Sequence, residues 1–169
     1  MRKIEIIAEA GVNHNGSLKK AIQLIKIAKK SNADYVKFQI FKAENVVTKK
    51  AGKSAYQKKS LKDKETQYQM IKNFELPYEK FKIIKKECKK NKIKFLCSPF
   101  DVESLGYLKK LKEKVIKIPS GEITNYPLIV QIGKMNIRVI MSTGMCNYKE
   151  IKDSINLLIK SGTKRKNIT

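Results

Sequence analysis

Five short apolar runs in this chain each end in polar residues, and this pattern limits the possible folds more than any other feature. The runs lead into AEAGVNHNG, VKFQIFKAENV, FLCSPFD, KIPSGE and MSTGM. Each polar group stands where a buried strand would give way to a loop or a helix. Parallel α/β enzymes collect their chemistry at the carboxyl ends of their strands, where loops distant in sequence meet. The pattern therefore predicts an enzyme built on a parallel sheet.

The segments between these runs have the apolar periodicity of amphipathic helices. We expect strands over residues 4–8, 35–41, 93–97, 115–118 and 139–141. We expect helices after Ser17, over about 62–73, after Pro77, after Asp101, from Pro127 and after Asn147. Residues 167–169 resemble the first step of a sixth strand. Strands repeated every 20 to 30 residues, roughly, are typical of βα units.

Five βα units fit either an open doubly wound sheet or the first part of a (β/α)8 barrel, and periodicity alone does not choose. No GxGxxG follows the first run and no GxxxxGK[ST] occurs in the chain. The usual nucleotide-binding reasons for an open sheet are therefore missing. We expect an α/β fold in which residues 1–169 form a partial TIM barrel of about five βα units.

The chain is strongly basic, with 38 Lys and Arg against 15 Asp and Glu and a formal charge of +23. Such an excess raises nucleic acids and anionic membranes as partners. Only three of these residues are arginines, although base readout and bidentate phosphate contacts favour the guanidinium group. We therefore interpret the lysines as solvated helix faces and expect no nucleic-acid partner. A basic nucleic-acid-binding module is the less favoured alternative, which a steep salt dependence of oligonucleotide binding would support.

The three cysteines, Cys88, Cys97 and Cys146, have no metal-ligand spacing, and their odd number does not indicate a disulfide framework. The chain shows neither a signal-peptide pattern nor an apolar stretch long enough to cross a bilayer. We predict a cytoplasmic protein with no membrane partner.

Six motifs occur in the order IAEAGVNHNG, DYVKFQIFKAEN, SAYQKK, FLCSPFD, KIPSGEITNYPL and MSTGM. In this order and at these intervals they resemble the N-acetylneuraminate (sialic acid) synthase family, which includes legionaminate and pseudaminate synthases. The resemblance implies a homodimer whose N-terminal barrel precedes an antifreeze-protein-like domain that contributes to the neighbouring subunit's active site. It also implies condensation of phosphoenolpyruvate with an N-acetylated aldose, such as N-acetylmannosamine. The products would be a nonulosonic acid, such as N-acetylneuraminate, and phosphate.

The resemblance further implies a divalent metal, manganese or magnesium, held by two histidines on later strands. This chain contains only His14, in its first loop, so we predict no metal ligand within it. Strands six to eight and the C-terminal domain likewise have no counterpart among these residues. A truncated, non-catalytic relative is therefore an alternative to an active enzyme, because an open half-barrel would expose an unpaired edge and an apolar face.

The candidate binding residues stand at the strand ends. Lys37 interrupts an apolar strand, which is costly unless an anion or acidic partner meets its charge, or unless the strand is an exposed edge. The resemblance implies that Lys37, Ser98, Ser120 and Ser142 bind phosphoenolpyruvate, although each serine alone also fits a turn or a cap. Many relatives have STPF where this chain has CSPF, which leaves the Ser98 hydroxyl as the donor there. Gln39 shares a strand face with Lys37, and the resemblance makes it a substrate contact.

Glu9 and Glu122 are the candidate acid–base residues. The condensation needs a proton on the aldehyde oxygen as the enol carbon attacks, and water must add before phosphate leaves, so positioned carboxylates are useful. The resemblance implies that Glu122 contacts the sugar and takes part in proton transfer, with Glu9 as a second candidate. Either carboxylate could instead accept from backbone N–H groups or pair with Lys37.

Two loops complete the set of candidates. Residues 13–16 fit either a tight turn with glycine at a special backbone angle or a direct ligand contact. Tyr56 and Gln57 belong to a long loop that we expect to cover the site, on the basis of its length alone.

Overall fold

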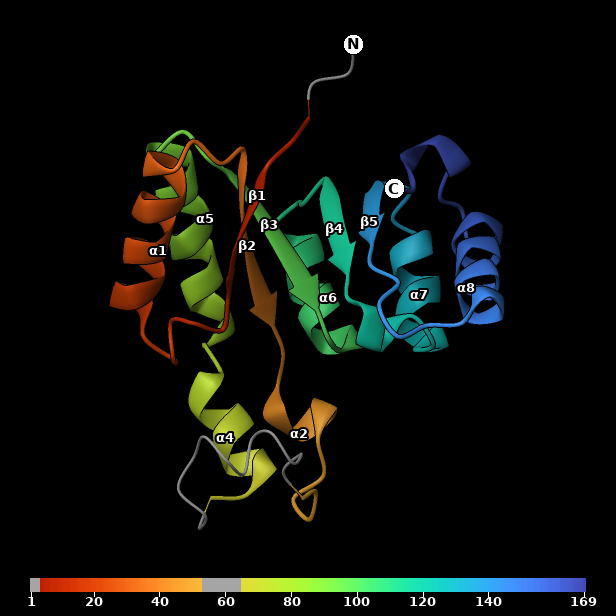
Figure 1. Ribbon diagram of the computed structural model, residues 1–169, viewed down its shortest axis with the longest axis horizontal. Helices are drawn as coiled ribbons and strands as arrows, with labels where there is room; N and C mark the ends of the chain where they lie inside the picture. The colour runs from red at the N-terminus through yellow and green to blue at the C-terminus, as the bar shows by residue number, and fades with distance from the viewer. Residues whose placement is uncertain (1–3, 53–64) are drawn as a thin grey trace.

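A computed structural model describes residues 4–52 and 65–169 as parallel strands with accompanying helices (Figure 1). The strands are β1 (Ile7–Gly11), β2 (Tyr35–Ile40), β3 (Lys94–Pro99), β4 (Val115–Ile118) and β5 (Arg138–Met141). The helices are α1 (Leu18–Lys30), α2 (Ala43–Val46), α4 (Gln67–Phe74), α5 (Tyr78–Lys90), α6 (Val102–Lys110), α7 (Tyr126–Gly133) and α8 (Tyr148–Lys160). Two 3₁₀ turns are η1 (Ser120–Glu122) and η2 (Arg165–Asn167).

The strand order decides between the two architectures that the sequence allowed. β1, β2 and β3 pair in parallel in chain order, β4 pairs in parallel with β5, and β3 lies beside β4. A doubly wound sheet reverses its strand order at a switch point, whereas a (β/α)8 barrel keeps the strands in sequence. The order β1 to β5 is that of a barrel, so the predicted α/β partial TIM barrel is confirmed.

The start of the predicted sixth strand is also present. Ile168 forms a parallel bridge with Val139 of β5. The Thr169 N–H donates to the Val139 carbonyl over 2.9 Å, and the Met141 N–H donates to the Thr169 carbonyl over 2.8 Å. These bonds continue the barrel order beyond β5.

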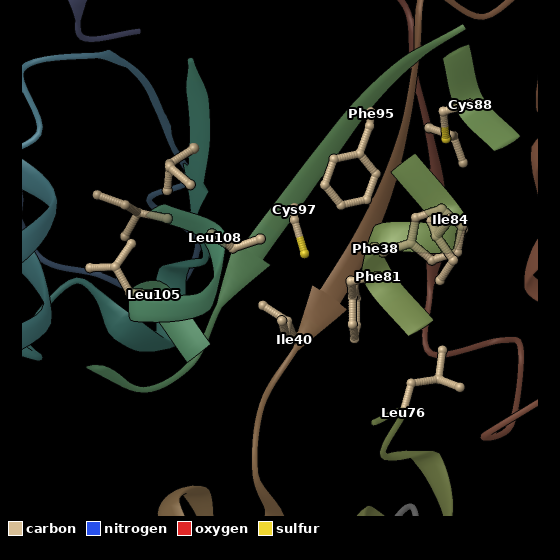
Figure 2. Close-up of a cluster of buried hydrophobic side chains, with 14 of the residues drawn as sticks. Phe38, Ile40, Leu76, Phe81, Ile84, Cys88, Phe95, Cys97, Leu105 and Leu108 are labelled. Atoms are coloured by element: carbon tan, nitrogen blue, oxygen red, sulfur yellow. The ribbon is translucent and has the colours of Figure 1, made fainter. Parts of the chain in front are cut away.

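Alternate residues of each strand face the helices and form the core. Val36, Phe38 and Ile40 of β2 are buried in one cluster with residues of β3 and β4. Figure 2 shows part of this cluster, in which side chains of the strands meet those of α5 and α6. The predicted inward residues of α5 are buried there: Phe81, Ile84 and Cys88. Because strand side chains alternate, the intervening residues project from the opposite face of the sheet.

The first strand differs from the prediction, since it covers residues 7–11 instead of 4–8. Ile4 and Ile6 are 80% and 54% exposed, so these two apolar side chains have no core to enter. The predicted helix over 62–73 is observed as α4. Thr66 caps the N-terminus of this helix and forms a capping box with Gln69. The shift of β1 moves Glu9 from a loop into the strand itself.

The lysines of α1 lie on its exposed side, as predicted from the periodicity. Lys19, Lys26, Lys29 and Lys30 are exposed, and the opposite side of the helix is buried against the sheet. Over residues 4–52 and 65–169, the helices are all too short or too polar to cross a membrane.

Candidate active site

Four predicted site residues share the face of the sheet that points away from the helices. Lys37 and Gln39 alternate with the core residues of β2, and the parallel register places Gln39 opposite Ser98 of β3. Glu9 of β1 is the register partner of Lys37. In a barrel this face is the interior, and its carboxyl end is the usual place for chemistry.

Lys37 is buried and paired. Its ammonium lies 2.5 Å from a Glu9 carboxylate oxygen, and its side chain is 9% exposed while that of Glu9 is 53% exposed. β2 lies between β1 and β3, so the explanation of Lys37 by an exposed edge strand is wrong. The expected acidic partner is present, and its half-exposed carboxylate leaves the Lys37 site open on one side.

Lys117 of β4 belongs to the same cluster, although sequence reasoning missed it. It stands between the fully buried residues Ile116 and Ile118 and so faces inward. The pKa of Lys117 is lowered to about 8, mainly by burial and to a smaller extent by the charge of Lys37, while the charge of Glu9 opposes the shift. These couplings place Lys117, Lys37 and Glu9 in one electrostatic environment. The sequence contains a signal for this residue, because Lys117 interrupts an apolar strand in the same way as Lys37.

Ser98 carries a buried hydroxyl that has no hydrogen-bond partner among the described residues. Such groups are nearly always satisfied in folded proteins, and an exception requires a specific explanation. Ser98 faces the same side as Lys37 and lies beside Gln39 in the register. Its hydroxyl is therefore available to a ligand bound on the inward face.

Ser120 and Ser142 follow β4 and β5 in two loops that pack against each other. The Ser142 N–H donates to the Ile118 carbonyl over 3.0 Å, and the Cys146 thiol donates to the Ser120 carbonyl over 3.5 Å. A Cβ at Gly144 would lie 3.6 Å from the Ser120 hydroxyl oxygen. The loops hold both serines at the carboxyl end of the sheet, but no described contact joins either serine to Lys37.

Glu122 ends η1 and is held by a local hydrogen bond. The Asn125 side-chain amide donates to its carboxylate over 2.7 Å. Burial raises the pKa of Glu122, the negative charge of Asp101 raises it further, and the Asn125 hydrogen bond opposes both. Asp101 is fixed as the predicted cap of α6, accepting from the Ser104 N–H over 2.7 Å. In the part of the chain that the structure describes, no salt bridge links Glu122 to Lys37.

The first loop is a tight turn, as one of the two interpretations predicted. Gly16 has a φ of +71°, and a Cβ there would lie 2.7 Å from the Asn73 carbonyl oxygen. His14 is buried, and its Nδ1 accepts from the Gly16 N–H over 3.1 Å. Burial lowers the pKa of His14 to about 4, so the ring is neutral. The predicted cover residues Tyr56 and Gln57 lie outside the described residues.

The residues that the structure describes do not form the divalent-metal site that the resemblance implies. Within residues 4–52 and 65–169, His, Cys, Asp and Glu side chains do not gather in threes as a metal would require. His14 has one ring nitrogen occupied, and its ring lies against Phe38 with centroids 6.2 Å apart. We assign it no metal.

Comparison with known proteins places this chain in a family. The sequence model of the NeuB family matches residues 24–169. The chain belongs to the NeuB family. It is 51% identical over 169 residues to an N,N'-diacetyllegionaminic acid synthase of Campylobacter jejuni, covering all of this chain and 51% of that protein. It is 44% identical over 151 residues to a synthase of the same name from Legionella pneumophila, covering 89% of this chain and 42% of that protein.

Solved NeuB-type structures agree with the fold. The N-acetylneuraminic acid (sialic acid) synthetase of Leptospira borgpetersenii matches with a TM-score of 0.80 at 27% identity, over 96% of this chain and 52% of that one. The predicted family is therefore confirmed, and the named synthases confirm that it is a family of sugar-acid-forming enzymes. The chain spans about half the length of the curated relatives it matches.

Proposed function

We propose that this NeuB-family chain provides the phosphoenolpyruvate-binding part of a nonulosonic acid synthase. The reaction would condense phosphoenolpyruvate with an N-acetylated aldose, such as N-acetylmannosamine or a related sugar, to give a nonulosonic acid and phosphate. The observation that carries the proposal is the cluster of Lys37 and Lys117 beside the unpartnered Ser98 hydroxyl on the inward face. The 51% identity to a legionaminic acid synthase supports the substrate class.

The charges of the cluster suit an enol phosphate. Phosphoenolpyruvate has two anionic groups, and charge-assisted hydrogen bonds to ammonium groups are stronger than neutral ones. Lys37 is buried and Lys117 is half-buried, which strengthens these interactions, and among the described residues Glu9 offsets part of their charge. Binding of a dianion would compensate the second ammonium, which burial now destabilises. The hydroxyls of Ser98, Ser120 and Ser142 would add neutral donors.

The carboxylates would serve proton transfer. The bond forms between the enol carbon of phosphoenolpyruvate and the aldehyde carbon, while the aldehyde oxygen takes a proton. Water then adds at the cationic centre and loses a proton, and the bond to phosphate breaks to leave the 2-keto acid. Glu122 is suited to hold the first proton, because its raised pKa favours the protonated form. Glu9 is the candidate to accept the proton from water, since its carboxylate pairs with the Lys37 ammonium and is half exposed.

The remaining parts of the proposal concern the whole protein. The proposed reaction also uses a divalent metal, manganese or magnesium, and the proposed enzyme is a homodimer. No nucleic-acid or membrane partner is proposed. The three cysteines are free, which supports a reducing, cytoplasmic compartment.

The test is phosphate release from phosphoenolpyruvate by a chimera in which this chain replaces the matching segment of the Campylobacter jejuni relative. We expect turnover that requires phosphoenolpyruvate, an N-acetylated aldose and a divalent metal together. Matched variants Lys37→Met and Lys94→Met remove one lysine each, the second from a largely exposed site outside the cluster. Loss of activity in Lys94→Met equal to that in Lys37→Met would contradict the proposed role of the cluster.

A non-catalytic role is the second candidate, favoured by the coverage of only about half of each relative. It predicts that the 169-residue chain alone releases no phosphate under conditions in which the chimera does. Robust turnover by the chain alone would exclude it.

A further inference from the structure

An apolar pocket of about 230 Å³ lies at the carboxyl ends of β1 to β3. Figure 1 shows α2 and α4 beyond these strand ends, away from the helices that cover the sheet. Phe41 and Phe100, which follow β2 and β3, line the pocket with their rings edge to face and their centroids 6.1 Å apart. The walls also include one residue of α2 and three of α4: Val46, Gln67, Ile71 and Phe74.

Gln39 lies between this pocket and the cluster of Lys37 and Lys117. Its side chain lines the pocket, and it stands two residues after Lys37 on the same face of β2, about 6.6 Å further along the strand. Within the described part of the chain, no hydrogen bond holds the Gln39 amide. Both its donor and its acceptor are therefore available to a ligand that extends from Lys37 towards α4.

The combination of mainly apolar walls with two side-chain amides, those of Gln39 and Gln67, fits an N-acyl group. Binding pockets commonly join apolar walls with a few placed polar groups. An N-acyl substituent has an apolar end and an amide, and the Gln39 amide can donate to its carbonyl and accept from its N–H. The Campylobacter jejuni relative is named for a product with two N-acetyl groups.

We propose that this pocket binds an N-acyl substituent of the sugar, and that Ile71 and Phe74 determine which acyl groups are accepted. The proposal rests on the synthase function proposed above. A water molecule occupies roughly 30 Å³ in the liquid, so the pocket is larger than an acetyl methyl group requires. Propanoyl and butanoyl groups should also enter it, because each further buried methylene favours binding by about fourfold.

The test compares sugars that differ only in the acyl group. The chimera is assayed by phosphate release with N-acetyl-, N-propanoyl- and N-butanoylmannosamine, unchanged and as Ile71→Trp, which fills the pocket. Ile83→Trp makes the same change on α5, at a side chain that is 40% exposed and does not line the pocket. Phe74→Ala enlarges the pocket and provides an independent variant if Ile71→Trp fails to fold.

We expect Ile71→Trp to lower kcat/KM for the butanoyl sugar at least about tenfold more than for the acetyl sugar, corresponding to two methylenes excluded. Phe74→Ala should shift the preference towards the butanoyl sugar. Neither change should alter KM for phosphoenolpyruvate by more than about twofold, because the pocket lies away from the lysine cluster. Equal effects on all three sugars, or the same pattern in Ile83→Trp, would overturn the pocket assignment.

A binding measurement separates this proposal from the proposed function. The 169-residue chain contains no tryptophan, so Phe74→Trp, an exchange of one aromatic side chain for another, introduces a single fluorophore at the pocket wall without using the filling variant Ile71→Trp. Butanoylmannosamine, added with phosphoenolpyruvate, should shift its emission, whereas the emission of Ile83→Trp should not change. If the unchanged chimera releases no phosphate with any sugar, the synthase function fails, and a missing emission shift then rejects the pocket as well. Phosphate release without acyl discrimination rejects the pocket alone.

Discussion

The buried His14 ring makes the stability of this chain depend on pH. Burial lowers the pKa of His14 from its ordinary value of 6.5 to about 4, so between these values the unfolded chain binds a proton that the folded chain does not. Below pH 6.5 this proton uptake favours unfolding, and the effect is complete below about pH 4. The contribution of the neutral His14 ring to stability is therefore fully present above pH 6.5 and is lost as the pH falls towards 4.

The size of the loss follows from the shift. Each pKa unit corresponds to about 1.36 kcal/mol, so the full loss is about 3 kcal/mol. At pH 5 the unfolded state is almost fully protonated and the folded state almost fully neutral, which gives a loss of about 2 kcal/mol. This is a large part of the stability of an ordinary domain, which is about 5 to 15 kcal/mol.

The assay is urea unfolding at pH 7.5 and pH 5, for the unchanged chain and for His14→Gln. Glutamine does not titrate, and its amide oxygen can replace the Nδ1 that accepts from the Gly16 N–H. Other groups titrate equally in both proteins, so the difference between the two pH-dependent losses isolates His14. We expect the unchanged chain to lose about 2 kcal/mol more than the variant. Equal losses in the two proteins would refute the reasoning.

Three further predictions concern the site and its supporting loop. In the chimera, Lys117→Met should raise KM for phosphoenolpyruvate by roughly 10- to 100-fold, since hydrogen bonds to charged groups contribute about 1.5–3 kcal/mol. With the native residue, KM for phosphoenolpyruvate should rise as the pH passes about 8, where Lys117 loses its proton. The Lys117→Arg variant should lack this pH dependence, which steady-state kinetics would measure. Glu122→Gln should lower kcat by roughly 100-fold or more while KM for phosphoenolpyruvate stays within about twofold, and a change confined to KM would contradict its role as an acid. Gly16→Ala should destabilise the chain by about 1–3 kcal/mol in urea unfolding, because its φ is +71° and a Cβ would meet a backbone carbonyl. Gly52→Ala, where a Cβ meets nothing within 4 Å, should have little effect, and similar losses in both would argue against strain.

The sequence was most informative about residues whose chemistry conflicts with their surroundings. Lys37 could be identified as a site residue because an ammonium group in an apolar strand requires a partner. The same reasoning applies to Lys117, which interrupts the shorter apolar strand β4, and the structure adds it to the cluster. Ser98 was found through its motif, and its unsatisfied hydroxyl became visible only in the structure.

Contacts between segments far apart in the chain could not be predicted in the same way. The Glu9–Lys37 ion pair depends on the register of β1 against β2, and the start of β1 was predicted three residues early. Exposed apolar residues such as Ile6 imitate a buried strand in sequence, because periodicity does not record which side chains reach a core. The pocket beside Gln39 depends on α4, whose position relative to the strand ends has no local signal.

The sequence by itself determined the alternation of strands and helices and the inward position of Lys37 and Gln39, because these features arise from short-range periodicity. It also determined the family, through motifs that keep their order. Only the tertiary structure decided that the strands follow a barrel order, that Lys117 joins Lys37 and Glu9, and that α4 walls an apolar pocket. Those outcomes depend on strand pairing and on the packing of distant elements, which are properties of the whole fold and have no local trace in the chain.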